Sequence, residues 1–484
     1  MLTISQNEIL DRFEFDNPWW TPGSGIEKRF AELPRRFYFS PFLALIQDRS
    51  VNRAVVVMGP RRVGKTVMVF HAIQALLDAG ISGQSIFYIS IETPLYTGIP
   101  LEKMLGMFQK RFEHKKDESL FIFFDEVQYL RDWEIHLKSL VDSYPSYSFV
   151  VTGSAAAALK LKSQESGAGR FTDFILPPLT FSEYLNFINR ENELIEKIEI
   201  SKTRSGSINY RALNIDELNK EFCNYLNFGG YPEAVMSKVI QADPGRYIKS
   251  DIIDKVLLRD LPSLYGISDV QELNRLFTTL AYNTGNEITL EGLSMSAGVA
   301  KNTIKRYLEY LEAAFLIRRV HRIDQNARHF KRAIKFKVYL TNPSMRSALF
   351  GHIEEDSVAI GHLVETAIYS QWLHSPSIDN LYYARWGAGE VDIVYVEQDT
   401  QKPTWIVEVK WTDRAVSNHS ELDNCAEFIG NTIKNAKRAL VTTKTVSEQI
   451  TYNGVDFEFI PSSTYAYTVG ANILDREGKK RVPT

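Results

Sequence analysis

Cysteine is almost missing from this chain. Only Cys223 and Cys425 occur among its 484 residues, and neither is part of a CxxC pair. So few cysteines exclude a scaffold built on disulfides and a zinc site built on cysteine ligands. The sequence therefore indicates a protein of a reducing compartment, and we expect a cytoplasmic location.

Long apolar runs and a large charge imbalance are missing too. No run approaches the roughly 20 apolar residues that a helix needs to cross a bilayer, and residues 1–8 lack the basic and apolar parts of a signal peptide. The formal net charge is -3, which gives the chain as a whole no attraction to nucleic acid. We expect no membrane partner, and any binding of DNA would need a local basic surface.

What is present is the composition of an ordinary globular protein. Hydrophobic residues make up 44% of the chain and charged residues 24%. A chain of 484 residues is too long for a single hydrophobic core, so we expect roughly three or four domains.

A glycine-rich segment, GPRRVGKT, directly follows the apolar run 54–58 and satisfies the full GxxxxGK[ST] pattern. Its glycines let backbone N–H groups wrap phosphates, and the helix expected over 67–77 turns its positive end toward them. We expect Lys65 to reach the β- and γ-phosphates and the Thr66 hydroxyl to bind Mg²⁺. The residues predicted to hold ATP here are Gly59, Pro60, Arg61, Arg62, Val63, Gly64, Lys65 and Thr66.

Two acids end a second apolar strand, which covers 120–124. Because neighbouring residues on a strand point to opposite sides, the two carboxylates can take different tasks. We expect Asp125 to join the Mg²⁺ shell and Glu126 to polarise the attacking water, which predicts ATP hydrolysis. A third strand, 148–151, runs into Thr152, whose hydroxyl would sense the γ-phosphate or orient water; a simple turn is the alternative there.

With these motifs the chain resembles a bacterial and archaeal family of AAA-type, signal-ATPase-like proteins with a C-terminal domain of unknown function. The residues that carry the resemblance are 59–66, 124–128, Thr152-Gly153-Ser154, Gly169-Arg170 and the segment YLNFGGYPEAV at 225–235. The resemblance implies that Arg170 completes the nucleotide site, in cis or in trans, which would make a homo-oligomer plausible. It also implies that Pro232 helps to hold the base, with an ordinary helix-breaking turn as the equal alternative.

From Gln271 onward the expected elements follow the order of a winged helix-turn-helix: a helix, a strand at 288–290, a helix around 293–295 and a long helix at 302–314. The last helix would enter a DNA groove. Its polar residues are Lys301, Asn302, Thr303, Lys305 and Arg306. Residues 301–337 contain eleven Lys or Arg and three acids, an excess that would bind a phosphate backbone if it lay on one face. A packing module that binds no DNA is the alternative.

The last part resembles the PD-(D/E)xK nuclease superfamily, through a helix at 361–365, a strand at 381–386, a hairpin at 389–393 and a strand at 405–410. Glu408 and Lys410 are two residues apart on a strand and would share one face, which Asp392 could join. The resemblance implies a second divalent ion held by Asp392 and Glu408, with Glu365 as an outer ligand and Lys410 acting on the water. A retained fold without catalysis is the alternative.

The predicted fold class is multidomain α/β: a P-loop parallel three-layer sheet with a helical lid, a winged helix-turn-helix and a C-terminal PD-(D/E)xK-like domain. The predicted ranges are an approach segment at 1–50, an AAA-type core at 51–180, a lid at 181–265, the winged helix at 266–345, the nuclease-like domain at 346–466 and a tail at 467–484.

These parts lead to one main functional hypothesis, an ATP-hydrolysing, DNA-directed protein in which the ATPase core controls the winged helix and the nuclease-like module. DNA processing or defence would be its setting. The alternatives are a signalling ATPase that acts on a protein partner through an inactive nuclease-like domain, and a nucleotide-gated transcription regulator.

Overall fold

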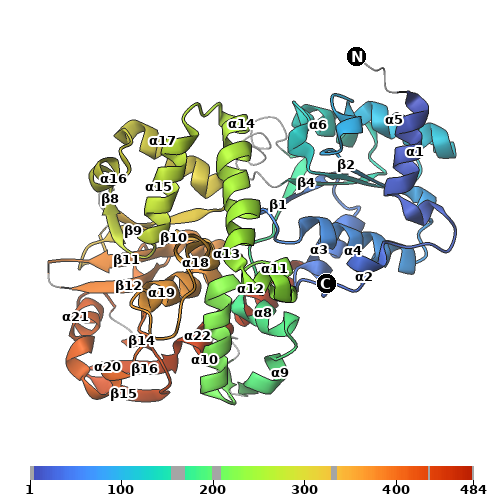
Figure 1. The fold of residues 1–484 in the computed structure, drawn as a ribbon. Helices are drawn as coiled ribbons and strands as arrows, with labels where there is room; N and C mark the ends of the chain where they lie inside the picture. The colour runs from blue at the N-terminus through green and yellow to red at the C-terminus, as the bar shows by residue number, and fades with distance from the viewer. Residues whose placement is uncertain are drawn as a thin grey trace. The chain divides into compact units, whose positions relative to one another are not determined.

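The computed structural model describes residues 5–153, 169–198, 209–328, 335–387, 389–433 and 437–481 (Figure 1). Ser154, Lys331 and Arg332, which the sequence analysis used, lie outside these ranges. The chain divides into two compact units, one made of Met1–Pro177 with Glu477–Thr484 and the other of Pro178–Arg476. Among the described residues, no helix combines the length and the apolar character that a bilayer span demands.

The described part of the first unit is built on a five-stranded sheet whose neighbouring strands all pair in parallel, in the order β2-β3-β4-β1-β5. Its strands are β1 (Ala54–Met58), β2 (Ile86–Ser90), β3 (Phe121–Asp125), β4 (Ser148–Gly153) and β5 (Phe171–Ile175). Its helices are α1 (Gln6–Asp16), α2 (Lys28–Ala31), α3 (Phe39–Gln47), α4 (Lys65–Asp78), α5 (Leu101–Phe112) and α6 (Trp133–Ser143). Every residue of β1, β3 and β4 is buried, as expected of parallel strands covered on both faces. The predicted P-loop α/β sheet is confirmed.

The aromatic approach segment packs on the outer strand of this sheet. The indole N–H groups of Trp19 and Trp20 both donate to the Ile86 carbonyl, at 3.2 and 2.9 Å. The Asn17 amide bonds both backbone groups of Tyr88, at 2.8 and 2.7 Å. These side chains therefore satisfy the backbone groups that β2 would otherwise leave open at the sheet edge.

In the second unit nine of the described strands form one sheet, in the order β15-β16-β14-β13-β12-β11-β9-β10-β8. They are β8 (Glu287–Thr289), β9 (Ile317–Ile323), β10 (Lys335–Leu340), β11 (Leu381–Arg385), β12 (Glu390–Val396), β13 (Pro403–Glu408), β14 (Arg438–Thr443), β15 (Glu448–Tyr452) and β16 (Val455–Pro461). Strands β9 and β11 run parallel and meet at Tyr383↔Arg322 and Ala384↔Ile323. The predicted winged helix and nuclease-like domain are therefore not separate bodies, because one sheet runs through both.

Helices surround this sheet, and a two-stranded hairpin, β6 (Ile195–Ile198) with β7 (Asn209–Ala212), lies apart from it. The helices that precede the winged-helix segment are α8 (Phe181–Phe187), α9 (Glu191–Leu194), α10 (Ile215–Phe228), α11 (Pro232–Met236), α12 (Lys238–Ala242), α13 (Pro244–Tyr247), the π-helical η5 (Ile248–Asp254) and η6 (Val256–Asp260), and α14 (Leu261–Tyr265). Later helices are α15 (Val270–Tyr282), α16 (Leu290–Ala297), α17 (Lys301–Ala313), α18 (Ser344–Phe350), α19 (Ile360–Gln371), α20 (Arg414–Ser417), α21 (Asp423–Thr432) and α22 (Ser462–Arg481).

The range 181–265, predicted as a lid of the ATPase core, belongs to the second unit and packs within it. On α10, the Asn227 side chain bonds both the N–H and the carbonyl of Ile353, each at 2.9 Å. Nearer the start of the same helix, the Asn219 side chain accepts a hydrogen bond from the Ser463 hydroxyl at 2.6 Å. The prediction of a separate lid is wrong, because buried hydrogen bonds connect this range to residues of the second unit that are distant in sequence.

The predicted tail at 467–484 is also wrong for most of its length. Helix α22 continues to Arg481, and Tyr467, Val469, Ile473 and Leu474 on it are buried. The Tyr467 hydroxyl donates to Glu191 at 2.6 Å. Burial of these apolar side chains offsets the entropy lost when the helix becomes ordered. The polar residues at the end of the sequence gave no indication of this burial.

Candidate nucleotide site and a buried carboxylate cluster

The phosphate-loop residues 59–64 link β1 to the start of α4, and Lys65 and Thr66 open that helix. Gly64 has φ 94°, a left-handed conformation that glycine adopts at no steric cost. At Gly59 a Cβ would lie only 2.2 Å from the Leu176 carbonyl oxygen, so a side chain has no room there. Backbone geometry thus requires both glycines of the motif.

Lys65 lies inside its own loop. Its ammonium donates to the carbonyls of Gly59 and Pro60, at 3.0 and 2.8 Å, and the residue is 5% exposed. The buried Arg36, which the sequence analysis did not single out, donates to the Val63 carbonyl at 2.8 Å and to the Pro177 carbonyl at 3.0 Å. Two cations therefore bond carbonyl groups of the loop: Arg36 from a preceding segment, and Lys65 from the start of the helix that follows the loop.

The end of β3 brings three of the predicted residues together. Asp125 accepts from the Thr66 hydroxyl at 2.9 Å and from the Thr152 hydroxyl on β4, and also from the Tyr88 hydroxyl at 3.1 Å. Burial first, and repulsion from Glu126 second, raise the pKa of Asp125 to about 6. Two oxygens of the set predicted for Mg²⁺, those of Thr66 and Asp125, are thus already in contact.

Glu126 leaves the strand by a turn of the backbone. Its φ is 56°, in the left-handed region, and its N–H donates to the Thr152 hydroxyl at 3.2 Å. The Gln128 side-chain amide donates to the Glu126 carboxylate. The two carboxylates therefore have different partners. The backbone turn after β3 separates them, in addition to the alternation of side chains along a strand.

Arg170 is not at the nucleotide end of the sheet. Its carbonyl accepts from the Ala54 N–H at 2.9 Å, at the start of β1, whereas the phosphate loop follows the other end of that strand. Its guanidinium pairs with Asp142. The Arg170 backbone therefore lies beside the start of β1, and of the two open readings this position favours a role in trans. Pro232 opens α11 in the second unit.

The segment predicted as a winged helix-turn-helix, 266–345, has the four expected elements in order, α15, β8, α16 and α17. Strands β9 and β10 follow them, with β10 antiparallel to both β8 and β9. Helix α17 buries Ile304, Leu308 and Leu311. Its other face exposes Lys301, Asn302, Lys305 and Arg306, and Thr303 is half-buried. Lys301 is paired with Glu291 at 2.8 Å.

Several basic residues of 301–337 are paired with acids, one of them within this range and others outside it. Arg318 pairs with Asp379, and Arg319 pairs with Glu312. The β8 residue Glu287 lies 3.4 Å from the Arg322 guanidinium and 3.3 Å from the Lys335 ammonium. The basic residues of β9 and β10, the two strands of the wing, therefore do not form one uncompensated basic face. The sequence count missed this pairing, because Glu287 and Asp379 lie outside the counted range.

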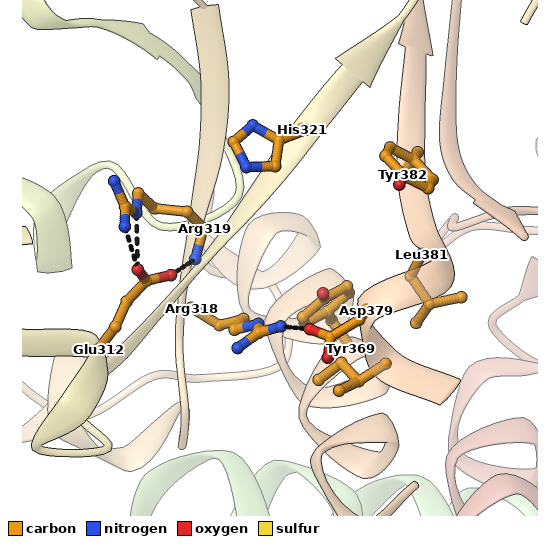
Figure 2. Close-up of a pocket in the computed structure, with 9 residues that line it drawn as sticks. Glu312, Arg318, Arg319, His321, Tyr369, Asp379, Leu381 and Tyr382 are labelled. Carbon is orange, nitrogen blue, oxygen red and sulfur yellow. Dashed lines mark hydrogen bonds and ion pairs between the residues drawn. The ribbon is translucent and has the colours of Figure 1, made fainter. Parts of the chain in front are cut away.

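A pocket of about 200 Å³ lies where β9 and β11 are not yet paired (Figure 2). Figure 2 shows the two ion pairs of its wall, Arg318 with Asp379 and Arg319 with Glu312. The remaining lining residues are His321, Tyr369, Ile378, Leu381 and Tyr382. Because Arg318 and Arg319 are both paired with carboxylates, the charges of these four lining residues balance.

The nuclease-like residues do meet, around a lysine that the sequence analysis did not include in this site. Lys410 donates to Glu408 at 2.8 Å, and the Val409 N–H donates to Asp392 at 2.9 Å. The ammonium of Lys337, on β10, lies 2.8 Å from Glu365 and 3.2 Å from Asp392. Glu390 is a further partner of Lys337 at 2.8 Å.

Electrostatics in this cluster follow from burial and from the two ammonium groups. Burial raises the pKa of Glu365 to about 7, and burial with repulsion from Asp392 raises the pKa of Glu408 to about 7. Burial opposes the charge on Asp392, but Lys337 and Lys410 lower its pKa below the ordinary value. Within the described ranges, no group of three or more acids, histidines or cysteines is arranged to hold a metal. With Lys337 among them, these carboxylates do not fit the predicted second divalent ion.

Comparisons with known proteins place this geometry in context. Residues 51–185 match the model of an AAA domain, and residues 219–356 match a domain of unknown function. An uncharacterized protein of Haemophilus influenzae is 23% identical over 427 residues, which are 86% of this chain and 95% of that protein. An uncharacterized protein of Methanocaldococcus jannaschii is 26% identical over 271 residues, or 55% of this chain and 56% of that protein.

Two solved structures share a low likeness. AMPPCP-bound DnaA from Aquifex aeolicus is 12% identical with a TM-score of 0.29, covering 61% of this chain and 92% of that one. The Hsp104:casein complex of S. cerevisiae is 13% identical with a TM-score of 0.30, covering 66% and 55%. A likeness this low carries no argument. The parallel sheet, the phosphate loop and the matched model together identify an AAA-type P-loop domain, of the nucleotide-binding ATPase class, in residues 51–185.

Proposed function

We propose that the first unit binds ATP with Mg²⁺ at the loop 59–66 and hydrolyses it with Glu126 as the general base. The observation that carries the proposal is the bonded set of Thr66, Asp125 and Thr152. It joins the start of α4 to the ends of β3 and β4, beside the loop that follows β1.

The loop is suited to exchange its internal partners for phosphate. Lys65 gives up the carbonyls of Gly59 and Pro60 when phosphate oxygens arrive, since a charged acceptor binds an ammonium more strongly than a carbonyl does. The first N–H groups of a helix are the ones that bind anions, and those of α4 would face the same phosphates. Binding thus uses groups that the fold already holds in position.

Hydrolysis needs a base and a place for the metal. Thr66 and Asp125 would hold Mg²⁺, which neutralises charge on the β- and γ-phosphates when bound. Glu126 accepts the proton of the attacking water, and Thr152, which the Glu126 N–H contacts, orients that water or the γ-phosphate. The products are ADP and inorganic phosphate.

Two variants test this function. Lys65→Ala removes the ammonium and should abolish binding of a fluorescent ATP analogue. Glu126→Gln keeps the shape but removes the base, so ATP should still bind while phosphate release falls on the order of 100-fold or more. Lys110→Ala, at an exposed position on α5, is the control and should behave as wild type. Unchanged phosphate release in both site variants would show that hydrolysis occurs elsewhere or not at all.

We also propose that α17 is a DNA-binding helix, because the segment has the element order of a winged helix and α17 exposes Asn302, Lys305 and Arg306 on one face. Its affinity should be modest, since the wing arginines already have acidic partners. A protein partner at the same unit is the competing proposal. Two further roles stay proposals: Arg170 acting in trans in a homo-oligomer, and Pro232 contacting the base.

A further inference from the structure

We infer that Lys337 is the resident cation of the carboxylate cluster and closes it to divalent metal ions. The cluster is then a structural joint between the wing and the nuclease-like strands, in place of the metal-dependent catalytic centre that the sequence suggests. This inference does not depend on ATP hydrolysis, because it concerns the second unit alone.

The contacts of the ammonium carry the inference. An ammonium has three N–H donors, and Lys337 has three carboxylate partners: Glu365 on α19, and Glu390 and Asp392 on β12. The Lys337 side chain is 3% exposed, and its ammonium lies 5.4 Å from the centre of the Tyr383 ring. The cation is therefore enclosed, with hydrogen bonds to Glu365 and Asp392 and an ion pair with Glu390.

A divalent ion would need the same oxygens. Asp392 and Glu365 are two of the three predicted metal ligands, and both already bond Lys337. The third, Glu408, is paired with Lys410 at 2.8 Å. A dication placed among them would be repelled by an ammonium within hydrogen-bonding distance of the same carboxylates.

The position of Lys337 within the sheet restricts movement of its backbone. It lies between two neighbouring strands, opposite Glu287 on β8 and Val320 on β9. Withdrawing its side chain would leave the carboxylates of Glu365 and Asp392, 9% and 12% exposed, close together without this cation. Removing one partner of a buried ion pair is strongly destabilising, because the remaining charge is left uncompensated. The strand that supplies the cation also fixes it.

The first measurement uses the intact, nucleotide-free protein. Binding of Mn²⁺ is followed by electron paramagnetic resonance for the wild type and for Asp392→Asn. The expected result is that Asp392→Asn removes no bound Mn²⁺, because the wild-type cluster holds none. Wild-type binding at millimolar Mn²⁺ that Asp392→Asn abolishes would overturn the inference, and this comparison requires no change at Lys337.

The second measurement removes the cation. Lys337→Met should lower the unfolding temperature of the second unit, and Lys337→Met with Glu365→Gln should recover part of that loss, because one buried charge of each sign is then gone. A Lys337→Met protein as stable as the wild type would overturn the inference. If Lys337→Met alone does not fold, a double variant that folds supports it, and a double variant that fails equally contradicts it.

Discussion

Asp125 accepts hydrogen bonds from three hydroxyl groups, those of Thr66, Tyr88 and Thr152. Hydroxyl donors stabilise its charge less than a cation would, so burial dominates and raises its pKa to about 6. An ionised Asp125 therefore destabilises the nucleotide-free fold at neutral pH. We expect metal binding to relieve that cost, which ties the stability of the first unit to its ligand.

Asp125→Asn should stabilise the nucleotide-free protein at pH 8 while it abolishes stabilisation by ATP with Mg²⁺. A raised folded-state pKa means that stability is present below the unfolded value of about 3.9 and is lost as pH rises through about 6. The gain of the variant should therefore be larger at pH 8 than at pH 5, and at most about 3 kcal/mol. Thermal unfolding at both pH values measures it.

The exposed Asp117→Asn is the matched control and should give no such pH-dependent gain. An Asp125→Asn protein that is less stable than the wild type at pH 8 would mean that its hydrogen bonds, and not its charge, decide the stability of the site.

At the scale of elements, α17 and β9 carry the basic residues of the same winged-helix segment but present them differently. The α17 residues Lys305 and Arg306 are exposed, whereas Arg319 on β9 is bonded to Glu312 through both its backbone N–H and its guanidinium. Only cations that can reach a phosphate release counterions on binding. The proposed binding of DNA therefore predicts that the contact is made by the helix.

Lys305→Ala combined with Arg306→Ala should weaken binding to duplex DNA and lower the slope of log affinity against log salt by roughly 2. Fluorescence anisotropy at several salt concentrations measures this slope. Arg319→Ala, the control within the same segment, should leave the slope unchanged and lower only the stability of the fold. Equal losses from both changes, or an affinity that does not respond to salt, would contradict the assignment.

Sequence patterns predicted the elements of this segment well and its charge pairing poorly. Helix α17 was expected at 302–314 and occupies Lys301–Ala313, because apolar residues recur at the helical period and local spacing decides such an element. Arg318 and Asp379 are 61 residues apart, and Lys337 and Asp392 are 55 apart. Pairs at such separations depend on strand order, which one sequence does not contain.

The same distinction between local pattern and strand order applies to the residues at the nucleotide site. Lys65, Thr66 and Asp125 follow from motifs whose physics is local, a loop before a helix and an acid after a strand. The position of Arg170 depends on the sheet order, since β5 pairs beside β1 and puts Arg170 next to Ala54. Arg36 carries no local signal, because its partners at Val63 and Pro177 are distant in sequence.

At the scale of the whole molecule, the division into two compact units predicts two calorimetric transitions. ATP with Mg²⁺ should move the transition of the first unit to higher temperature. At a ligand concentration of 100 times the dissociation constant, the free energy of unfolding of that unit should rise by about 2.7 kcal/mol. Asn227→Ala should lower the other, because it leaves the Ile353 N–H and carbonyl unpaired at about 1–3 kcal/mol each. Asn224→Ala, a partly buried position on the same helix, is the control.

One transition that responds as a whole to both changes would show that the units unfold together. Their boundary, at Pro177 and Pro178, lies close to the predicted end of the AAA-type core at residue 180. The boundaries within the second unit were harder to predict. Nothing local in 317–323 or 381–385 announces that these two strands will pair across the predicted domain border.

The joint between β9 and β11 also limits how this chain can be divided by truncation. Cutting it between Leu340 and Leu381 would separate two strands that shield each other's edges at Tyr383↔Arg322 and Ala384↔Ile323. Each fragment would then display an unpaired strand edge, that of β9 (IRRVHRI) or that of β11 (LYYAR), whose open N–H and carbonyl groups can pair with another chain and so favour aggregation. Either half of the second unit, produced without the other, is expected to come out insoluble.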